Sequence, residues 1–405
     1  MVVLSMRICV WSDTSFESSY ASYHLMRDII LAMIHEGHEV WLVQVQLSDG
    51  AIPKELEVQD NLHIVNIKQQ TVKKNNFIKR YINNILYFFE SSKKIEKINN
   101  IDAIFLQSTN VAFFPVRFAC RKKIPIIFNV QDIFPLDAAT TGILKKWNPI
   151  FLINRMMQSY AYKHSNKVIT ISEDLRRTLK QEGCNKTEII HNWSYQNEFF
   201  VISDSNNHFL KKYKIKREDG FRVVYAGNIG KMIDIDMIIK VATLLKSIKD
   251  IKFYIIGSGS NLNNLKESIS REKLKNIICY PSQPMEYAAD NYCMADVNIN
   301  PIHKGVIYTC TPSKINTCLL SRKPTVISMD LDSDMANKLA SVDNWKIVAP
   351  NDAESMAAAI RYYYMSSNWR CGDSMYSNNS HVFLKSIGPV ENAYKYAHII
   401  GDIYK

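Results

Sequence analysis

The sequence predicts an α/β protein with two doubly wound domains, each built on a parallel sheet. Short apolar strands alternate with amphipathic helices along nearly the whole chain of 405 residues, which is the length of two or three domains of about 150 residues. Apolar residues make up 47% of the sequence and charged residues 22%, as in an ordinary globular protein. This composition excludes a largely disordered, collagen-like or low-complexity chain.

The first strand–helix–strand unit lies at the N-terminus. Residues 7–11 form a buried strand pattern, and residues 20–35 place their apolar side chains on one helical stripe. Gly37 ends that helix, and the next strand pattern covers 39–45. Two strands joined by a helix imply a parallel sheet.

Further strand patterns form two series. They cover 63–67, 103–107, 124–130 and 167–171 in the first series, and 221–226, 251–256, 276–280, 296–301, 324–328 and 345–349 in the second. The polar stretch 195–219 between them is the expected linker. We therefore expect an N-terminal domain at 1–200 and a C-terminal domain at 201–385, and a last helix within 386–405 that can pack on either.

The compartment is predicted from what the sequence lacks. No apolar run approaches the ~20 residues of a membrane-spanning helix, and residues 1–10 lack the order of a signal peptide. The eight cysteines are never within three residues of one another, which argues against a zinc ribbon or a CxxC redox site. We expect a cytoplasmic protein, with attachment to the inner face of the cell membrane as a further possibility.

The net charge of +11 is concentrated in one stretch. Residues 68–100 hold eight Lys or Arg against two Glu, a local net charge of +6. Within it, 76–89 has the pattern of an amphipathic helix with basic edges. Two interpretations stay open: a helix that faces the core, or an interfacial helix on anionic lipid spanning 73–97. Nucleic acid is not an expected partner, because no recognised nucleic-acid module is present.

Four loops that follow strands carry candidate ligand-binding residues. The stretch 226–231 holds Gly230 and Lys231, and we expect the lysine to enter the next helix. The backbone N–H groups at that helix start would suit a phosphate. Gly257 and Gly259 form a glycine turn after a strand. By itself, such a turn is as often an ordinary turn as a ligand-binding loop. The third loop, 309–314, leads into a short helix at 315–320.

In that third loop, Ser313 lies at the helix start and Lys314 supplies a cation, and the two together would form an anion site. An ordinary capped helix with a surface lysine is the alternative. The fourth loop ends a strand of the first domain at Asp132, whose carboxylate could orient a hydroxyl or accept its proton. A simple turn residue is the alternative there.

Six stretches in register resemble glycosyltransferase family 4, the retaining transferases of GT-B fold. They are EGHEV at 36–40, ISE at 171–173, IIHNW at 189–193, YAGNIGK at 225–231, IIGSG at 255–259, and PSK at 312–314 followed by KPTVI at 323–327. The resemblance covers nearly the whole chain. Similar proteins make bacterial surface polysaccharides, including O-antigen and capsule.

The resemblance implies two Rossmann-like domains facing each other across a cleft, with a glycan or polyprenyl-linked acceptor on the first and a nucleotide-sugar donor on the second. It implies a hexosyl or N-acetylaminosugar transferase with no metal and no cofactor, most simply using a UDP-sugar. By position, the residues implied to contact the diphosphate are Gly230, Lys231, Ser313 and Lys314, and those implied to flank the base are Gly257, Gly259 and Ser282. Asp132 would orient the sugar or the acceptor hydroxyl.

Several positions depart from the family pattern, and two of them bear on the donor. Thr309 and Thr317 stand where many members carry glutamates, the second of which usually holds the nucleotide ribose. A catalytically degenerate transferase-like subunit is therefore one alternative function. A sugar-nucleotide epimerase on the same fold is another, although such enzymes use more acidic and histidine residues than these loops supply.

Overall fold

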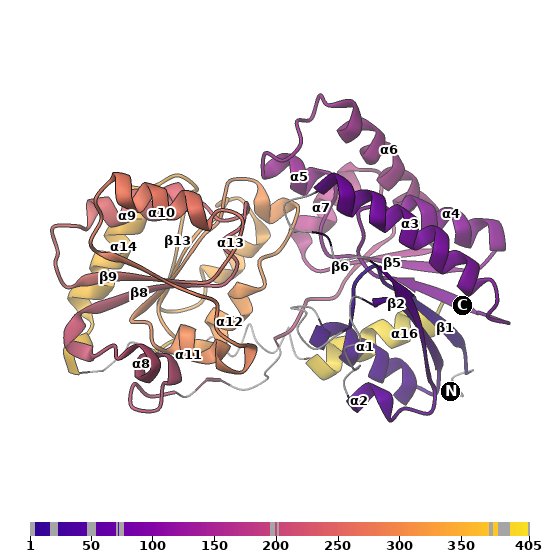
Figure 1. Cartoon of the computed structure of the whole chain (residues 1–405), viewed down its shortest axis with the longest axis horizontal. Coiled ribbons are helices and arrows are strands. Elements are labelled where there is room, and N and C mark those ends of the chain that lie inside the picture. Colours follow the sequence, from indigo (N-terminus) through magenta and orange to yellow (C-terminus); the bar gives the residue numbers. More distant parts are fainter. Residues whose placement is uncertain are drawn as a thin grey trace. The chain divides into compact units, whose positions relative to one another are not determined.

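The computed structural model describes residues 5–16, 23–46, 54–69, 72, 77–194, 199–200, 202–371, 376–379 and 389–403. Contacts divide the chain into two compact units, each of which is described by itself. The first unit comprises Met1–Tyr195, Thr309–Thr311 and Ile387–Lys405, and the second comprises Gln196–Tyr308 and Pro312–Ser386. The predicted fold class is confirmed, because both units are built on a parallel sheet with helices on its two faces (Figure 1).

The first unit has a seven-stranded sheet in the order β3-β2-β1-β4-β5-β6-β7. Its strands are β1 (Arg7–Trp11), β2 (Glu39–Gln46), β3 (Leu62–Lys68), β4 (Ala103–Leu106), β5 (Ile126–Val130), β6 (Lys167–Thr170) and β7 (Thr187–Ile189). Side chains alternate between the two faces, so that Cys9 and Trp11 enter one core while Ile8 and Val10 enter the other.

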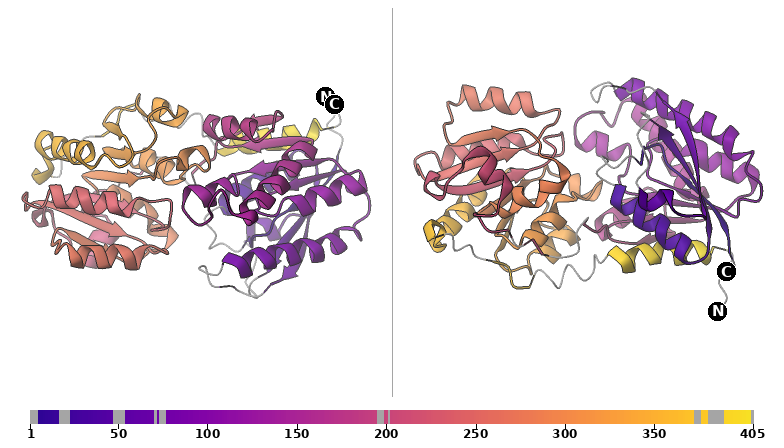
Figure 2. Two further views of the ribbon diagram at one scale, coloured as in Figure 1. Left: turned by 90° about the horizontal axis from the view of Figure 1, so that it is seen from above. Right: turned by 60° about the horizontal axis from the view of Figure 1, so that its bottom comes forward.

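Helices cover both faces of this sheet. They are α1 (Tyr23–His35), α2 (Lys54–Glu57), α3 (Phe77–Ile95), α4 (Phe113–Lys122), α5 (Leu136–Thr140), α6 (Pro149–His164), α7 (Glu173–Gln181) and α16 (Pro389–Gly401). Helices α3, α4, α6 and α7 contribute to one core, while α1 and α16 contribute to the other. Helix α16, in yellow, lies beside α1, so the end of the chain completes the first unit (Figure 2).

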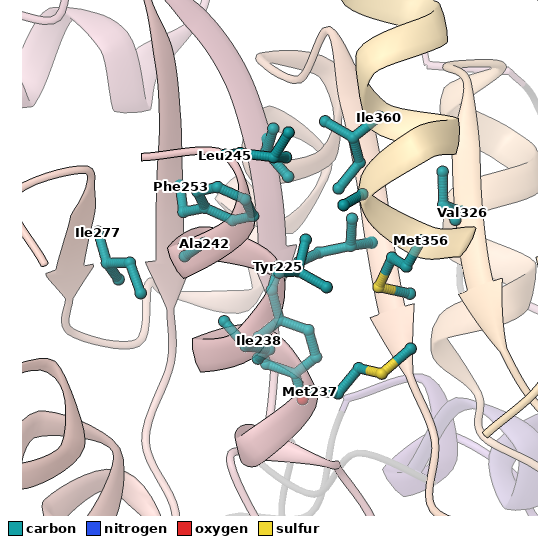
Figure 3. Packing of buried hydrophobic residues seen from close by; sticks show 14 of the residues in the cluster. Tyr225, Met237, Ile238, Ala242, Leu245, Phe253, Ile277, Val326, Met356 and Ile360 are labelled. Carbon is teal, nitrogen blue, oxygen red and sulfur yellow. The ribbon is translucent and has the colours of Figure 1, made fainter. Parts of the chain in front are cut away.

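The second unit has a six-stranded sheet in the order β10-β9-β8-β11-β12-β13. Its strands are β8 (Phe221–Ala226), β9 (Ile251–Ile256), β10 (Ile277–Tyr280), β11 (Val297–Pro301), β12 (Thr325–Ser328) and β13 (Trp345–Val348). Its helices are α8 (His208–Tyr213), α9 (Ile235–Leu244), α10 (Leu262–Arg271), α11 (Ala288–Cys293), α12 (Lys314–Ser321), α13 (Asp334–Leu339) and α14 (Ala353–Ser366). Figure 3 shows how Ile238 of α9 and Ile360 of α14 meet the core side chains of the strands.

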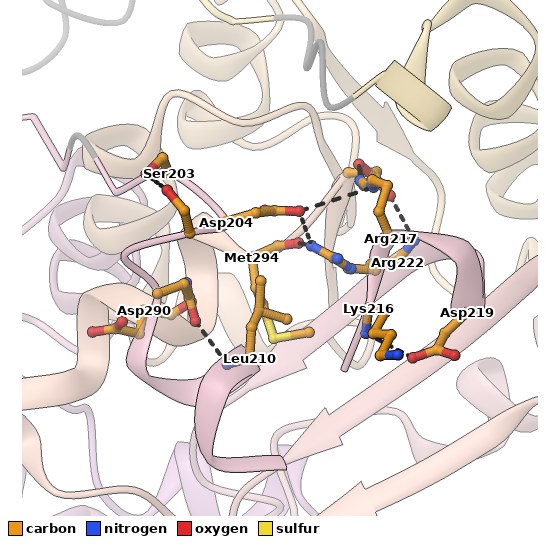
Figure 4. A network of polar contacts seen from close by, with 12 residues as sticks. Ser203, Asp204, Leu210, Lys216, Arg217, Asp219, Arg222, Asp290 and Met294 are labelled. Atoms are coloured by element: carbon orange, nitrogen blue, oxygen red, sulfur yellow. Dashed lines mark hydrogen bonds and ion pairs between the residues drawn. The ribbon is translucent and has the colours of Figure 1, made fainter. Parts of the chain in front are cut away.

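An ionic network lies at the amino end of β8, a central strand of this sheet (Figure 4). The Arg222 side chain is 1% exposed, and its Nη1 lies 2.7 Å from Oδ2 of Asp204. Asp296 accepts the backbone N–H of Arg222 at 2.8 Å and pairs with Arg217. The network ties the segment before β8 to the sheet, because it pairs charges whose isolated burial would be costly.

Three local differences from the expected elements have simple causes. Strand β7 was not expected, because its three residues are too short to show a pattern. The expected linker contains α8, which Asn207 caps and which buries Phe209 and Leu210. Lys231 does not enter a helix: it lies in a turn, and α9 begins four residues later at Ile235.

Two further predictions concern membrane contact. Among the residues that the structure describes, no helix combines the length and the apolar character needed to span a bilayer. Residues 73–76 of the predicted interfacial stretch lie outside the described residues. The remainder, 77–97, contains the whole of α3 and the two residues that follow it.

Candidate functional site: the glycine loops of the second unit

Each sheet has one position at which the strand order reverses, and ligands of such folds bind at the carboxyl ends of the strands there. In the second unit the reversal lies between β8 and β11, and in the first unit between β1 and β4. The loop 227–231 follows β8. The predicted phosphate loop therefore lies at the reversal point of its own sheet.

The glycines of the two predicted loops are required by close backbone contact. A Cβ atom on Gly257 would lie 1.9 Å from the carbonyl oxygen of Gly227, and one on Gly259 would lie 2.2 Å from that of Ile229. The backbone N–H of Ile229 donates to the carbonyl of Ser258 at 2.8 Å, which fixes the two loops together. Gly257 and Gly259 are thus structural requirements of a paired-loop cradle, and not simply turn residues.

Lys314 joins this cradle from the start of α12. A Cβ atom on Gly227 would lie 2.3 Å from Cε of Lys314, so the lysine side chain lies directly over that glycine. Its Nζ is 5.4 Å from the ring centre of Tyr225, at the end of β8. The side chain of Ser313 makes no capping hydrogen bond at the helix start. A cation and the positive end of a helix therefore lie beside the glycine loops.

The first loop differs from the prediction in how its charge is placed. Lys231 is exposed and lies in the turn before α9. The N-terminus of α9 is already capped, because the side chain of Asp234 accepts the N–H of Met237 at 2.9 Å. His303, which follows β11, places its Nδ1 3.7 Å from Oδ2 of the same aspartate. The helix start that we expected to bind an anion after Lys231 is thus occupied by a carboxylate.

Ser282 and the two threonines have different positions. The hydroxyl of Ser282 lies 2.9 Å from that of Ser258, so Ser282 does flank the glycine turn. Thr317 is half-buried on α12, three residues after Lys314. Thr309 is buried and belongs to the first unit, where its carbonyl accepts the N–H of Ile133 at 2.8 Å. Thr309 is therefore not grouped with the residues of the loops 227–231 and 257–259 in the second unit.

Asp132 lies in the first unit, directly after β5. It forms an isolated antiparallel bridge with Cys310, and its side chain is exposed. The surrounding protein, and secondarily the charge of Asp137, raise the pKa of Asp132. Because the side chain keeps contact with solvent, retained hydration limits that rise.

Asp13 is a candidate that the sequence reasoning missed. It follows β1, and its Oδ2 accepts hydrogen bonds from Oγ1 of Thr109 at 2.6 Å and from Nδ2 of Asn84 at 2.9 Å. Thr109 follows β4, so the cluster lies at the reversal point of the first sheet. Burial raises the pKa of Asp13 to about 6. Its place directly after the first strand was the signal available in the sequence.

No group of three His, Cys, Asp or Glu side chains close enough to hold a metal ion is found among the described residues. Lys231 and Lys314 supply the positively charged side chains of the loop 227–231 and of the start of α12.

Comparisons with known proteins agree with this arrangement. The model of Glycosyltransferase Family 4 matches residues 24–193, and that of Glycosyl transferases group 1 matches residues 220–366. Together they cover both units. The chain is a glycosyltransferase of GT-B fold, and it belongs to glycosyltransferase family 4.

Two curated relatives are glycosyltransferases by name. The chain is 22% identical over 294 residues to the probable glycosyltransferase WbjE of Pseudomonas aeruginosa, covering 71% of this chain and 72% of WbjE. It is 22% identical over 199 residues to WcaI of Escherichia coli K12, a putative colanic acid biosynthesis glycosyl transferase, covering 48% of this chain and 49% of WcaI. The name of the second relative assigns that protein to colanic acid biosynthesis.

Solved structures show the same fold. HepE (Alr3699) of Anabaena, in complex with UDP and glucose, has a TM-score of 0.69 at 14% identity, covering 98% of this chain and all of that chain. WaaG, a glycosyltransferase involved in lipopolysaccharide biosynthesis, has a TM-score of 0.60 at 13% identity, covering 97% and 95%. Identities this low speak for the fold alone.

Proposed function

We propose that this protein transfers a hexosyl or N-acetylaminosugar residue from a UDP-sugar, with retention of configuration, to a lipid-linked surface polysaccharide. The observation that carries the proposal is the cradle of the second unit, in which Lys314 lies over Gly227 beside the turn 257–259. Such a cradle suits a diphosphate, because backbone N–H groups and a cation stabilise the leaving charge without a metal. The UDP bound in the HepE structure supports the choice of base.

In the proposed reaction the bond between the anomeric carbon and the diphosphate oxygen breaks, and a bond to the acceptor oxygen forms on the same face of the sugar. The acceptor proton passes to the departing diphosphate, so UDP leaves and no strong protein base is needed. Lys314 would stabilise the charge that develops on that diphosphate. Asp132 would orient the acceptor hydroxyl.

The test measures UDP release from UDP-glucose, UDP-galactose and their N-acetylamino derivatives with a polyprenyl diphosphate-linked sugar as acceptor. We expect Lys314→Ala to lower kcat about a hundredfold while leaving the unfolding temperature nearly unchanged. Lys346→Ala is the matched control, because Lys346 also lies over a tyrosine ring of this unit, 4.4 Å from Tyr362, but on β13. Unchanged turnover in Lys314→Ala would contradict the assignment.

One result would favour the degenerate-subunit alternative. If the wild-type protein bound no nucleotide and released no UDP from any donor, the threonines at 309 and 317 would mark a lost donor site.

NMR of the product distinguishes retention from inversion, because the two outcomes give different anomers.

A further inference from the structure

Helix α3 has apolar side chains on two opposite faces. Its inward face is buried in the core of the first unit through three side chains, Tyr87, Phe88 and Ile95. Its outward face exposes three others at the spacing of a single helical stripe, Ile82, Leu86 and Phe89. Lys79 and Lys93 are exposed and continue this stripe at its two ends. The core-facing interpretation of this helix therefore accounts for only one of its apolar faces.

Helix α6 and the residues before it form a second exposed apolar surface. Trp147 and Met156 are each 73% exposed, and Ile153 lies between them with 56% of its surface exposed. On α6, Ile153 and Met156 lie outside the buried face that includes Phe151 and Asn154. Half of the large apolar side chains that are exposed among the described residues, nine of eighteen, lie on α3 or within 143–156.

Both surfaces lie on the same side of the first unit. Helices α3 and α6 contribute to the same core on one face of the sheet, so their outward faces both point away from that sheet (Figure 1). A hydrogen bond of 2.5 Å from the hydroxyl of Tyr81 to Oδ1 of Asn154 joins the two helices. Because Ile82 and Ile153 are the sequence neighbours of these two residues, the exposed surfaces continue from the point where the helices meet.

The charge around this apolar surface is positive. From 138 to 172 the chain has no Asp or Glu but five Lys or Arg. Two of the five form ion pairs, Arg155 with Glu182 and Lys167 with Glu188. Nζ of Lys145 lies 5.4 Å from the ring centre of Trp147. Exposed tryptophan and aliphatic side chains bordered by lysines are suited to the boundary between lipid headgroups and acyl chains.

We infer that the outward surface of α3 and of 143–156 docks the first unit onto an anionic lipid bilayer. The apolar side chains enter the acyl boundary, and the lysines at 79, 93, 145 and 146 contact lipid phosphates. A second copy packed face to face would need acidic groups opposite Lys145 and Lys146, and 138–172 supplies none. Glu90, exposed beside Phe89 on α3, is outnumbered by the four lysines. The inference does not depend on the donor loops, because they belong to the other unit.

The test is co-sedimentation of the full chain with vesicles, without nucleotide. We expect binding to vesicles of equal parts phosphatidylcholine and phosphatidylglycerol, little binding to phosphatidylcholine alone, and release at high salt. The combined variant Leu86→Gln, Phe89→Gln, Trp147→Gln and Met156→Gln should weaken the binding at least tenfold. Lys145→Gln with Lys146→Gln should weaken it about fivefold for each lysine removed.

The matched control is Leu244→Gln with Met365→Gln. Met365 is 76% exposed and, with Leu244, lines an apolar surface of the second unit, so its removal changes hydrophobicity but not the docking surface. Equal loss of binding in the control, or no binding of the wild-type chain to the anionic vesicles, would overturn the inference. A dimer of the wild-type chain in sedimentation velocity would also overturn the inference, if the combined variant abolished that dimer and still bound vesicles as the wild type does. Circular dichroism of each variant separates these results from misfolding.

Discussion

At the scale of single residues, Asp13 is a half-buried carboxylate whose position costs stability. In the folded protein its pKa is about 6, against 3.8 for an ordinary aspartate. The native state therefore binds more protons than the unfolded state between these pH values, and stability falls as the pH rises through this window. Above pH 6 the full cost of the buried charge is present.

Asp13→Asn should remove this pH dependence. The asparagine Oδ1 can still accept from Thr109 and Asn84, so the local geometry is kept. We expect the variant to match the wild type near pH 4 and to be more stable by about 2 kcal/mol at pH 7.5, after a discount for partial hydration. Thermal unfolding of both proteins across this range is the measurement, and a variant less stable at pH 7.5 would contradict the prediction.

Gly257 is a residue at which even one methyl group is too large. Its Cβ would lie 1.9 Å from the backbone oxygen of Gly227, so Gly257→Ala must separate the two donor loops. We expect a loss of about 3 kcal/mol of stability together with the loss of UDP binding. Calorimetric titration with UDP and urea unfolding measure the two effects.

Gly37→Ala is the control for that substitution. Gly37 also has a positive φ, +87°, but a Cβ there would meet no atom within 4 Å. Gly37→Ala should lower the free energy of unfolding by about 1 kcal/mol through backbone strain and leave UDP binding intact. If Gly257→Ala bound UDP as tightly as Gly37→Ala does, the loop contact would not matter for the donor site.

At the scale of elements, the start of β8 depends on Arg222. Replacing this buried side chain with alanine leaves a cavity and removes the closer of the two ion pairs of Asp204, so Arg222→Ala should cost about 3 kcal/mol of stability. Arg222→Met should recover more than half of this, because methionine fills the space and Asp204, 43% exposed, can be hydrated. Equal losses in the two variants would show that the ion pair, and not the packing, dominates.

Arg370→Ala supplies the exposed counterpart in the same unfolding experiment. Arg370 is 65% exposed and pairs with Asp250 at 2.7 Å. Its removal should cost less than about 1 kcal/mol, as for most surface ion pairs.

Elements with strong periodic patterns were predictable, and elements that depend on distant contacts were not. The bounds of β1, β8 and β9 agree with the sequence prediction, because each is a short apolar run bounded by polar or turn residues. Strand β7 and helix α8 are short, and tertiary contacts define them. For α3, the pattern predicted an amphipathic helix but could not show which apolar side chains the core would leave exposed.

At the scale of the whole molecule, the two-unit α/β architecture follows from the alternation of strands and helices. The return of α16 to the first unit does not follow from the local pattern, since it depends on contacts with α1. The same limit applies to the site. The glycines and Lys314 could be predicted from motifs, whereas the grouping of Thr309 with the first unit and the capping of α9 by Asp234 needed the structure.

Because the two units do not share a core, a donor nucleotide should stabilise one unit more than the other. The most direct test of the proposed function is therefore thermal unfolding with UDP, GDP, CMP or ADP, for the wild type, Lys314→Ala and Lys346→Ala. A nucleotide at a hundred times its Kd adds about 2.7 kcal/mol to the unit that binds it. We predict that UDP raises the unfolding temperature of the wild type and of Lys346→Ala but not that of Lys314→Ala. No shift with any nucleotide, or an equal shift in Lys314→Ala, would contradict a donor site at these loops.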